Sequence, residues 1–251
     1  MTGKITMTET LTENIDQFIS FFRDRLDEIG KISNVLYAHQ YQKLLYLSAV
    51  DALARVRWPK EPSNQRRFTE FVHGFAKWPD DRRVSLPHLD KLLKDSTALQ
   101  FSALREFVRR KMKDWKPGRI YSLDVDPDIE DIIKLWPKSD DGKDVKLHGL
   151  GIKSLTHIKL LYACRNTLVH EFRSPSADFS SAGPSYVNQL SIPYVGGRKT
   201  EVWTLSYPVS FIKGIATNCL DNLETYLRQN KIDPYDSFVF GDYWLDLLNR
   251  D

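Results

Sequence analysis

The chain has 251 residues, of which 41% are hydrophobic and 27% are charged, a composition typical of a globular protein with a sizeable core. Its formal net charge of +3 is mildly basic, which permits nucleic-acid binding without requiring it. No apolar run reaches the roughly 20 residues of a membrane span, and the polar residues 1–14 do not resemble a secretory signal. We therefore expect a cytoplasmic protein with no membrane partner.

The first part of the sequence predicts three helices. Apolar residues over 12–31 recur with the helical period of about 3.6. Residues 37–58 are apolar around much of a helical circumference and precede Pro59, so we expect a buried helix that ends there. A third helix begins after Ser63. Asp51, inside the second helix, is interpreted as a structural hydrogen-bonding residue in preference to a catalytic one.

The middle of the sequence predicts a short helix over 86–94 and a longer one over 98–115. The longer helix has a cationic face, formed by Arg105, Arg109, Arg110, Lys111 and Lys113. Such a face is usually solvated, and contact with nucleic acid is the alternative. Residues 120–153 are irregular, acidic and rich in turns, so we expect an insertion or a lid there. We expect one domain over 1–251.

The last part of the sequence predicts the only strands. Residues 189–195 and 201–207 have strand composition, and a glycine-containing turn joins them into a β-hairpin over 186–208. An amphipathic helix over 209–229 follows. The aromatic segment 237–248 is expected to pack back on the body or on a partner chain. The predicted fold is mainly α, a multi-helix bundle with one small β-hairpin.

A helix predicted over 154–173 has two unlike sides on a wheel of about 100° per residue. One side holds the apolar residues Leu160, Leu161, Cys164, Leu168 and Phe172. The other side holds Lys159, Tyr162, Asn166, His170 and Arg173. Arg165 and Val169 lie at the border. Because the second side carries donors and no carboxylate, it suits a phosphate-bearing ligand. His157 falls on the apolar side and is expected to be buried and hydrogen-bonded.

The remaining residues with metal-binding chemistry indicate no metal site. Cys164 and Cys219 both lie in helical patterns with apolar neighbours, and we interpret them as reduced core residues in preference to a disulfide. Neither cysteine has the spacing of a metal ligand, and the same holds for His39, His88 and His148. We expect neither a metal nor a cofactor.

Arg165, Asn166 and His170 form the pattern Arg-Asn-x-x-x-His. This pattern resembles the signature of the HEPN superfamily, in which an arginine, a polar residue, a few variable residues and a histidine lie near the end of a helix. The resemblance covers about residues 154–173. It implies a bundle of HEPN type and a metal-independent endoribonuclease that works as a homodimer, with the motif helices of two protomers forming one cleft. It also implies RNA as substrate, an antitoxin or regulatory protein as partner, and a role in toxin–antitoxin or phage-defence systems.

The resemblance implies a role for each motif residue. His170 would transfer a proton with the attacking 2′-hydroxyl or the leaving 5′-oxygen, Arg165 would stabilise the scissile phosphate, and Asn166 would orient His170 or the phosphate. His170 and Asn166 share a helix face, whereas His170 and Arg165 are about 140° apart. These two converge only through the length of the arginine or across a dimer. RNA contacts are expected from Lys159, Tyr162, Arg173, Arg198 and Lys199.

Three other interpretations of the same residues stay open. His170 fits a surface histidine, and Arg165 fits an ion-pair partner of Asp51 or Glu171. The chain fits a non-catalytic helical module that binds a nucleotide, an RNA or a protein. It also fits a scaffold whose aromatic residues 237–251 mediate assembly.

Overall fold

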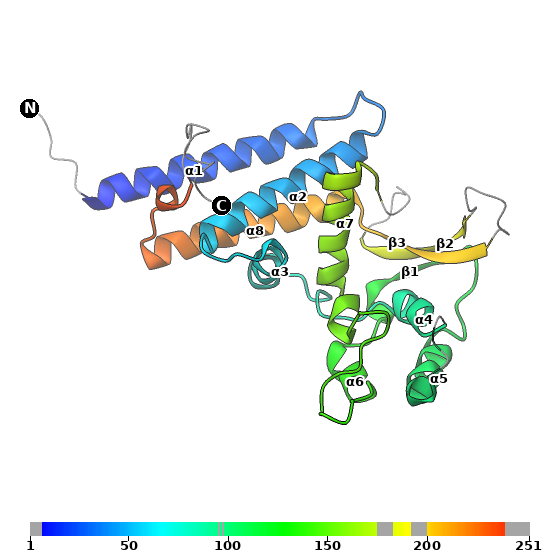
Figure 1. Cartoon of the computed structure of the whole chain (residues 1–251). Coiled ribbons are helices and arrows are strands. Elements are labelled where there is room, and N and C mark those ends of the chain that lie inside the picture. The colour runs from blue at the N-terminus through cyan, green and yellow to red at the C-terminus, as the bar shows by residue number, and fades with distance from the viewer. Residues whose placement is uncertain (1–6, 95, 97, 175–182, 192–199, 239–251) are drawn as a thin grey trace, which may run out of the picture. The chain divides into compact units, whose positions relative to one another are not determined.

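The computed structural model describes residues 7–94, 96, 98–174, 183–191 and 200–238 (Figure 1). The fold is mainly helical with one small antiparallel sheet, which confirms the predicted fold class at this level. The chain divides into two compact units, one formed by Met1–Lys77 with Lys213–Asp251 and the other by Trp78–Ile212. The sequence indicated no boundary at either point.

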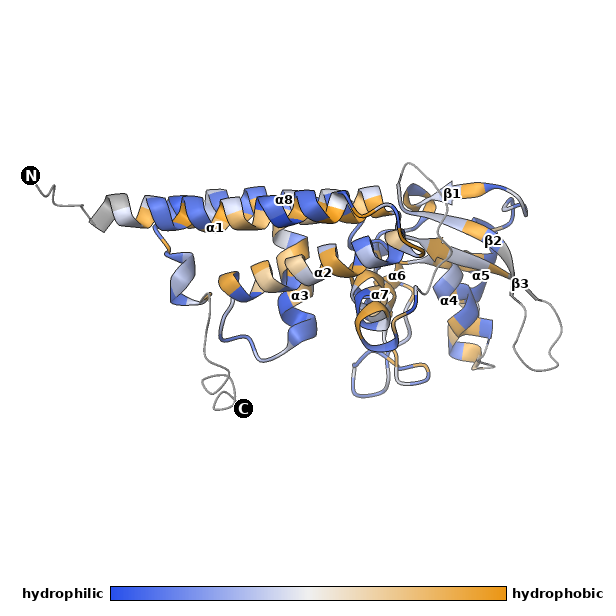
Figure 2. Ribbon diagram, turned by 90° about the horizontal axis from the view of Figure 1, so that it is seen from above, coloured by the Kyte–Doolittle hydropathy of each residue, from blue (hydrophilic) through white to orange (hydrophobic). Residues whose placement is uncertain are grey.

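The first unit is a helical bundle. It contains α1 (Met7–Gly30), α2 (Ala38–Arg57), α3 (Asn64–Phe75), most of α8 (Val209–Asn230) and the 3-10 helix η4 (Pro234–Asp236). Hydrophobic and hydrophilic residues alternate along α1 and α8 as in amphipathic helices (Figure 2). The apolar residues of α1 are buried at the predicted spacing, namely Ile15, Phe18, Ile19, Phe22, Leu26 and Ile29. The predicted helices therefore exist, with α1 beginning earlier than expected.

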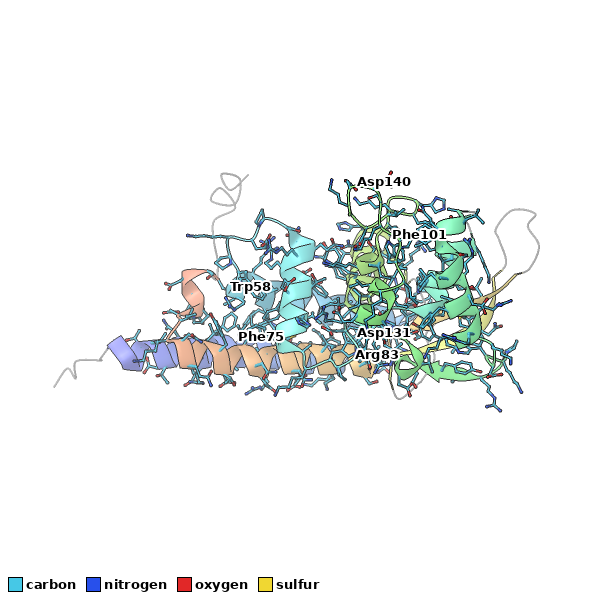
Figure 3. The ribbon with its side chains drawn as sticks, turned by 90° about the horizontal axis from the view of Figure 1, so that it is seen from below. Trp58, Phe75, Arg83, Phe101, Asp131 and Asp140 are labelled. Atoms are coloured by element: carbon cyan, nitrogen blue, oxygen red, sulfur yellow. The ribbon has the colours of Figure 1, made fainter. Side chains whose placement is uncertain are left out.

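Polar contacts join α8 to the other helices of this unit. Arg23 of α1 lies 3.0 Å from Asp221 of α8. The side-chain amide of Asn222 donates to the carbonyl oxygen of Phe75 at 2.8 Å, and that of Asn218 donates to Ala76 at 2.9 Å. These amides satisfy carbonyl groups that the end of α3 leaves open. Phe75 also packs its ring against Trp58, with centroids 6.3 Å apart (Figure 3).

The second unit combines short helices with a sheet. Its helices are α4 (Leu86–Lys94), α5 (Ser102–Lys111), α6 (Ile129–Ile133) and α7 (His157–Glu171), with 3-10 turns η1 (Leu99–Phe101), η2 (Leu123–Val125) and η3 (Ile152–Leu155). The sheet has the order β1-β2-β3, formed by β1 (Ile120–Ser122), β2 (Ser185–Ser191) and β3 (Thr200–Ser206). The predicted hairpin is confirmed as β2 and β3, and its first strand begins earlier than expected. The third strand, β1, was not predicted.

The predicted helix over 98–115 is shorter in the structure. Its first turn is the 3-10 helix η1, and α5 ends at Lys111. Beyond the helix, Trp115 stacks on Tyr121 of β1, with ring centroids 4.5 Å apart. Arg105, expected on a solvated face, is half-buried and donates to the carbonyl oxygens of Ser96 and Ala98. It closes the loop before α5.

Residues 120–153, for which we expected an insertion or a lid, contribute to the core of the second unit. They supply β1 and α6, and they bury Ile129, Ile132, Trp136, Leu147 and Ile152 in one cluster with residues of α4 and α5. The ring of Trp136 packs against that of Phe101, with centroids 5.4 Å apart. The segment is therefore part of the packing that holds α4 and α5.

Two predicted features fall partly outside the described residues. The hairpin tip with Arg198 and Lys199 is not described. Of the aromatic C-terminal segment, Phe238 is described, and its ring lies 5.4 Å from that of Phe18 and 5.6 Å from that of Phe22. The segment thus begins by packing on α1 of its own chain. Among the described helices, none is long and apolar enough to cross a membrane.

Candidate functional site

The motif helix α7 runs from His157 to Glu171, so it is shorter at both ends than the predicted range 154–173. At its end Phe172 adopts a left-handed conformation with φ 55°. The chain turns away there, and Phe172 is 61% exposed, although the wheel placed it with the core residues. That part of the prediction is wrong, because the wheel continued a helix that had already ended.

The buried face of α7 is also rotated from the predicted one. Leu161, Cys164 and Leu168 are buried as expected, and both Cys164 and Cys219 are free thiols, as predicted. Tyr162, expected on the polar side, is buried as well and is only 8% exposed. The buried stripe therefore extends toward Arg165, and Tyr162 is not an exposed RNA contact.

Arg165 and Asn166 are in contact within the described structure. Both side chains are half-buried, and Nη1 of Arg165 donates to Oδ1 of Asn166 at 3.0 Å. This hydrogen bond draws the guanidinium from the border of the helix toward the face of Asn166. Asn166 thus links the arginine to the face on which His170 lies.

His170 is exposed in the last turn of α7. It lies four residues after Asn166, so the two side chains share a face. Beyond the helix, Nε of Arg173 donates to Oε2 of Glu171 at 2.6 Å. Lys159, near the start of α7, is half-buried. Among the predicted residues, the structure thus brings Arg165 and Asn166 together with His170 nearby on the helix, and places Lys159 and Arg173 at its two ends.

A buried carboxylate, Asp126, lies at the centre of a second constellation of polar side chains. Its Oδ1 accepts a hydrogen bond from the backbone N–H of Leu86 at 2.9 Å. Its Oδ2 lies 2.7 Å from Nε2 of His157 and accepts from the hydroxyl of Tyr186 at 2.6 Å. The prediction that His157 is buried and hydrogen-bonded is confirmed. Burial of a carboxylate is costly without such donors, so these contacts hold α4, α7 and β2 together.

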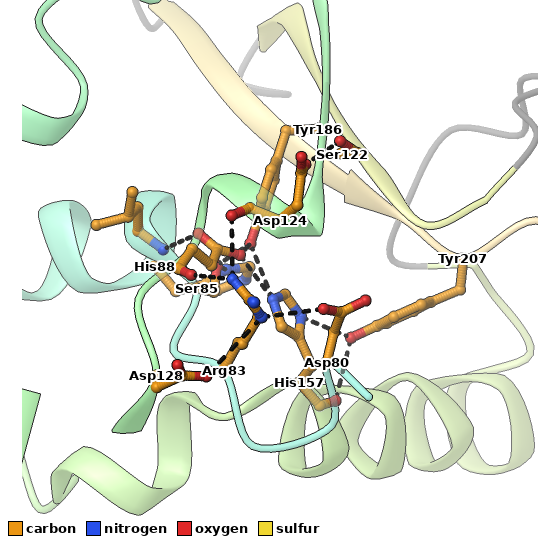
Figure 4. A network of polar contacts seen from close by, with 12 residues as sticks. Asp80, Arg83, Ser85, His88, Ser122, Asp124, Asp128, His157, Tyr186 and Tyr207 are labelled. Atoms are coloured by element: carbon orange, nitrogen blue, oxygen red, sulfur yellow. Dashed lines mark hydrogen bonds and ion pairs between the residues drawn. The ribbon is translucent and has the colours of Figure 1, made fainter. Parts of the chain in front are cut away.

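The same network continues toward the surface through Ser85. The hydroxyl of Ser85 lies 2.8 Å from that of Tyr186 and 2.7 Å from Nδ1 of His88. On the other side, the hydroxyl of Tyr207 donates to the carbonyl oxygen of His157 at 3.1 Å. A continuous series of hydrogen bonds therefore runs from His88 through the core of the second unit (Figure 4).

Burial shifts the pKa of three members of this network. Burial, with Asp126 close by, raises the pKa of Tyr186 well above its ordinary value, and burial also raises that of Tyr207. Both phenols therefore stay protonated and can donate. Burial, reinforced by His157, lowers the pKa of His88 from 6.5 to about 4. The His88 imidazole is consequently neutral at pH 7.

A pocket of about 350 Å³ lies between α4, α7 and β3. Its polar lining includes His88 and Lys91 from α4, Thr167 from α7 and Trp203 from β3. Its apolar lining includes Pro87, Leu160, Ala163, Val202 and Leu205. The described residues that line it include no carboxylate. This composition suits a small, partly apolar ligand with an anionic group.

The sequence did not indicate this second constellation. Ser85 and His88 are three residues apart at the start of a predicted helix, which was the one local signal. Asp126, Tyr186 and Tyr207 meet them only through the fold. Within the described part of the chain, no group of three or more His, Cys, Asp and Glu residues could hold a metal ion.

Comparison of the chain with protein-family models, with curated proteins and with solved structures gives no match. The resemblance to the HEPN superfamily therefore rests on the motif residues Arg165, Asn166 and His170.

Proposed function

We propose that the protein is a metal-independent endoribonuclease whose catalytic residues are Arg165, Asn166 and His170. The observation that supports this most is the 3.0 Å contact between Arg165 and Asn166, combined with an exposed His170 on the face of Asn166. Asn166 thereby holds the guanidinium of Arg165, and His170 stays exposed to a substrate. A guanidinium and an imidazole are side chains suited to phosphate chemistry.

In the proposed reaction the 2′-hydroxyl of a ribose attacks the adjacent phosphorus, and the bond to the 5′-oxygen breaks. The 2′-hydroxyl releases its proton to water, and His170 gives a proton to the leaving 5′-oxygen. Arg165 stabilises the additional charge on the phosphoryl oxygens. The products are a 2′,3′-cyclic phosphate and a 5′-hydroxyl, and DNA is resistant because it lacks the nucleophile.

Arg165 and His170 lie about 140° apart around α7, so one helix does not bring both to the same phosphate easily. We propose that two α7 helices of a homodimer form one cleft. In that cleft His170 of one protomer and Arg165 of the other act on the same phosphodiester.

The test is incubation of the purified protein with total RNA and with transfer RNA, beside His170→Ala and Arg165→Ala. We expect each variant to lose at least about 100-fold in cleavage rate. His73→Ala, an exposed histidine on α3, serves as the control and should cleave as the wild type does. Cleavage that both motif variants retain in full would exclude the assignment.

A further inference from the structure

We propose that the pocket between α4, α7 and β3 binds a nucleoside monophosphate unit, either as a free nucleotide or as one nucleotide of an RNA chain. The link between this pocket and His170 rests on the proposed ribonuclease function. The binding itself rests on the lining of the pocket alone.

The first argument is shape. The volume of about 350 Å³ falls in the range of small-ligand pockets, roughly 300–1,000 Å³. Leu160 and Leu205 supply apolar walls, and Trp203 supplies an aromatic one. The indole of Trp203 is fixed by Trp115 and Tyr121, whose ring centroids lie 5.0 and 5.4 Å away. A rigid aromatic wall between apolar side chains suits the flat, apolar faces of a nucleobase.

The second argument is hydrogen bonding at the polar edge of a base. Nδ1 of His88 is engaged by Ser85 at 2.7 Å, and within the described part of the chain Nε2 has no hydrogen-bond partner. Thr167 also lines the pocket, and its hydroxyl donates to the carbonyl oxygen of Ala163 at 3.1 Å, so its oxygen can still accept. A neutral imidazole and a hydroxyl oxygen can pair with the polar edge of a nucleobase.

The third argument is charge. Lys91 is exposed, one helical turn after His88, and is the one charged side chain among the described residues of the lining because His88 is neutral. No carboxylate opposes it there. A ligand with a single phosphate group can form a charge-assisted hydrogen bond with Lys91, and an uncharged ligand cannot.

The fourth argument is position on α7. Thr167 lines the pocket and is three residues before His170, so the two side chains are neighbours on the helix surface. A nucleotide whose base occupies the pocket and whose phosphate lies at Lys91 can therefore extend its ribose along α7 toward His170. The pocket would select the nucleotide next to the bond that is cut.

Binding is tested by titrating the 251-residue chain with the four nucleoside 3′-monophosphates, the four nucleosides and inorganic phosphate. Calorimetry and tryptophan fluorescence measure the binding. We expect saturable binding of at least one nucleotide.

Ala163→Trp should abolish this binding, because Ala163 is exposed on α7 and a bulky side chain there fills the pocket without disturbing the core. Lys91→Ala should weaken nucleotide binding about tenfold and leave nucleoside binding unchanged. Arg109→Ala, an exposed cation on α5, is the matched control.

A second arm uses a short single-stranded RNA. Tighter binding of the RNA than of the free nucleotide, with both lost in Ala163→Trp, identifies an RNA subsite. Equal affinity identifies a free-nucleotide site. Absence of binding by every nucleotide, or binding that Ala163→Trp leaves intact while its thermal unfolding matches the wild type, overturns the pocket assignment. Nucleotide binding without any RNA cleavage would support the nucleotide-binding pocket and reject the proposed ribonuclease function. RNA cleavage without nucleotide binding would support the ribonuclease function and reject the pocket assignment.

Discussion

Asp126 is a buried carboxylate that three donors from three parts of the second unit reach. No single element contains the site, so its geometry depends on the packing of α4, α7 and β2 together. A substitution that changes one atom of the Asp126 side chain therefore affects the packing of all three elements.

Replacement of Asp126 by Asn tests this role in stability. The amide removes the charge and turns one acceptor into a donor that faces the donors of His157 and Tyr186. We expect the free energy of unfolding to fall by roughly 1–3 kcal/mol, because the substitution leaves buried donors without an acceptor. Urea unfolding measures the loss. Asp128→Asn, at a side chain 67% exposed, is the control and should change stability by less than about 0.5 kcal/mol.

His88 gives the protein a pH-dependent stability in the acid range. Its pKa is about 4 in the folded protein and 6.5 in a solvated histidine, so the unfolded chain binds more protons between these pH values. The contribution is fully present above pH 6.5 and is lost as the pH falls toward 4. We expect His88→Gln to show a shallower decline of unfolding free energy over this window, measured by urea unfolding at several pH values. An unchanged decline, with exposed His73→Gln as reference, would contradict this.

At the scale of elements, α8 caps a neighbouring helix. The amide of Asn222 donates to the last carbonyl oxygen of α3, that of Phe75. We expect Asn222→Ala to lower the free energy of unfolding by about 1 kcal/mol and to speed amide hydrogen exchange at the end of α3. Asn230→Ala removes an amide that bonds within α8, to the carbonyl oxygen of Tyr226, and is the matched control. Equal effects of the two substitutions would argue against the cap.

Helices are the elements that the sequence predicted well. Helix α4 has the predicted bounds, because its apolar spacing, its polar flanks and its length agree. Strand β1 was missed because three residues carry no measurable alternation and it is defined by its partner, with Tyr121 opposite Tyr186. The end of α7 was misplaced because Phe172 ends the helix in a left-handed conformation. Glycine is the residue that usually marks such an end in a sequence, and here the position is a phenylalanine.

The candidate sites differ in the same way. Arg165, Asn166 and His170 could be proposed from the sequence because they lie within six consecutive residues of one predicted helix. The network around Asp126 could not be predicted from the sequence. Its members, from Ser85 to Tyr207, come together only when α4, α7, β2 and β3 pack. A pocket bounded by these elements has no signal in local spacing.

At the scale of the whole molecule, the proposed dimer makes a specific prediction about mixed variants. His170→Ala and Arg165→Ala are each expected to be inactive alone. Mixed and allowed to exchange protomers, they form heterodimers that combine an intact Arg165 with an intact His170 across the cleft. RNA cleavage should then reappear, measured at equal total protein. No recovery, despite heterodimers seen by native mass spectrometry, would place the complete site within one protomer.

The first unit is built from both ends of the described chain, since Arg23 of α1 pairs with Asp221 of α8 and Asn222 caps α3. During synthesis on the ribosome, the residues of the second unit emerge before α8 exists. We therefore expect the second unit to fold first. Until α8 is synthesised, the apolar faces of α1, α2 and α3 remain exposed to solvent. Slow synthesis after residue 212 would prolong the time in which these nascent helices need a chaperone.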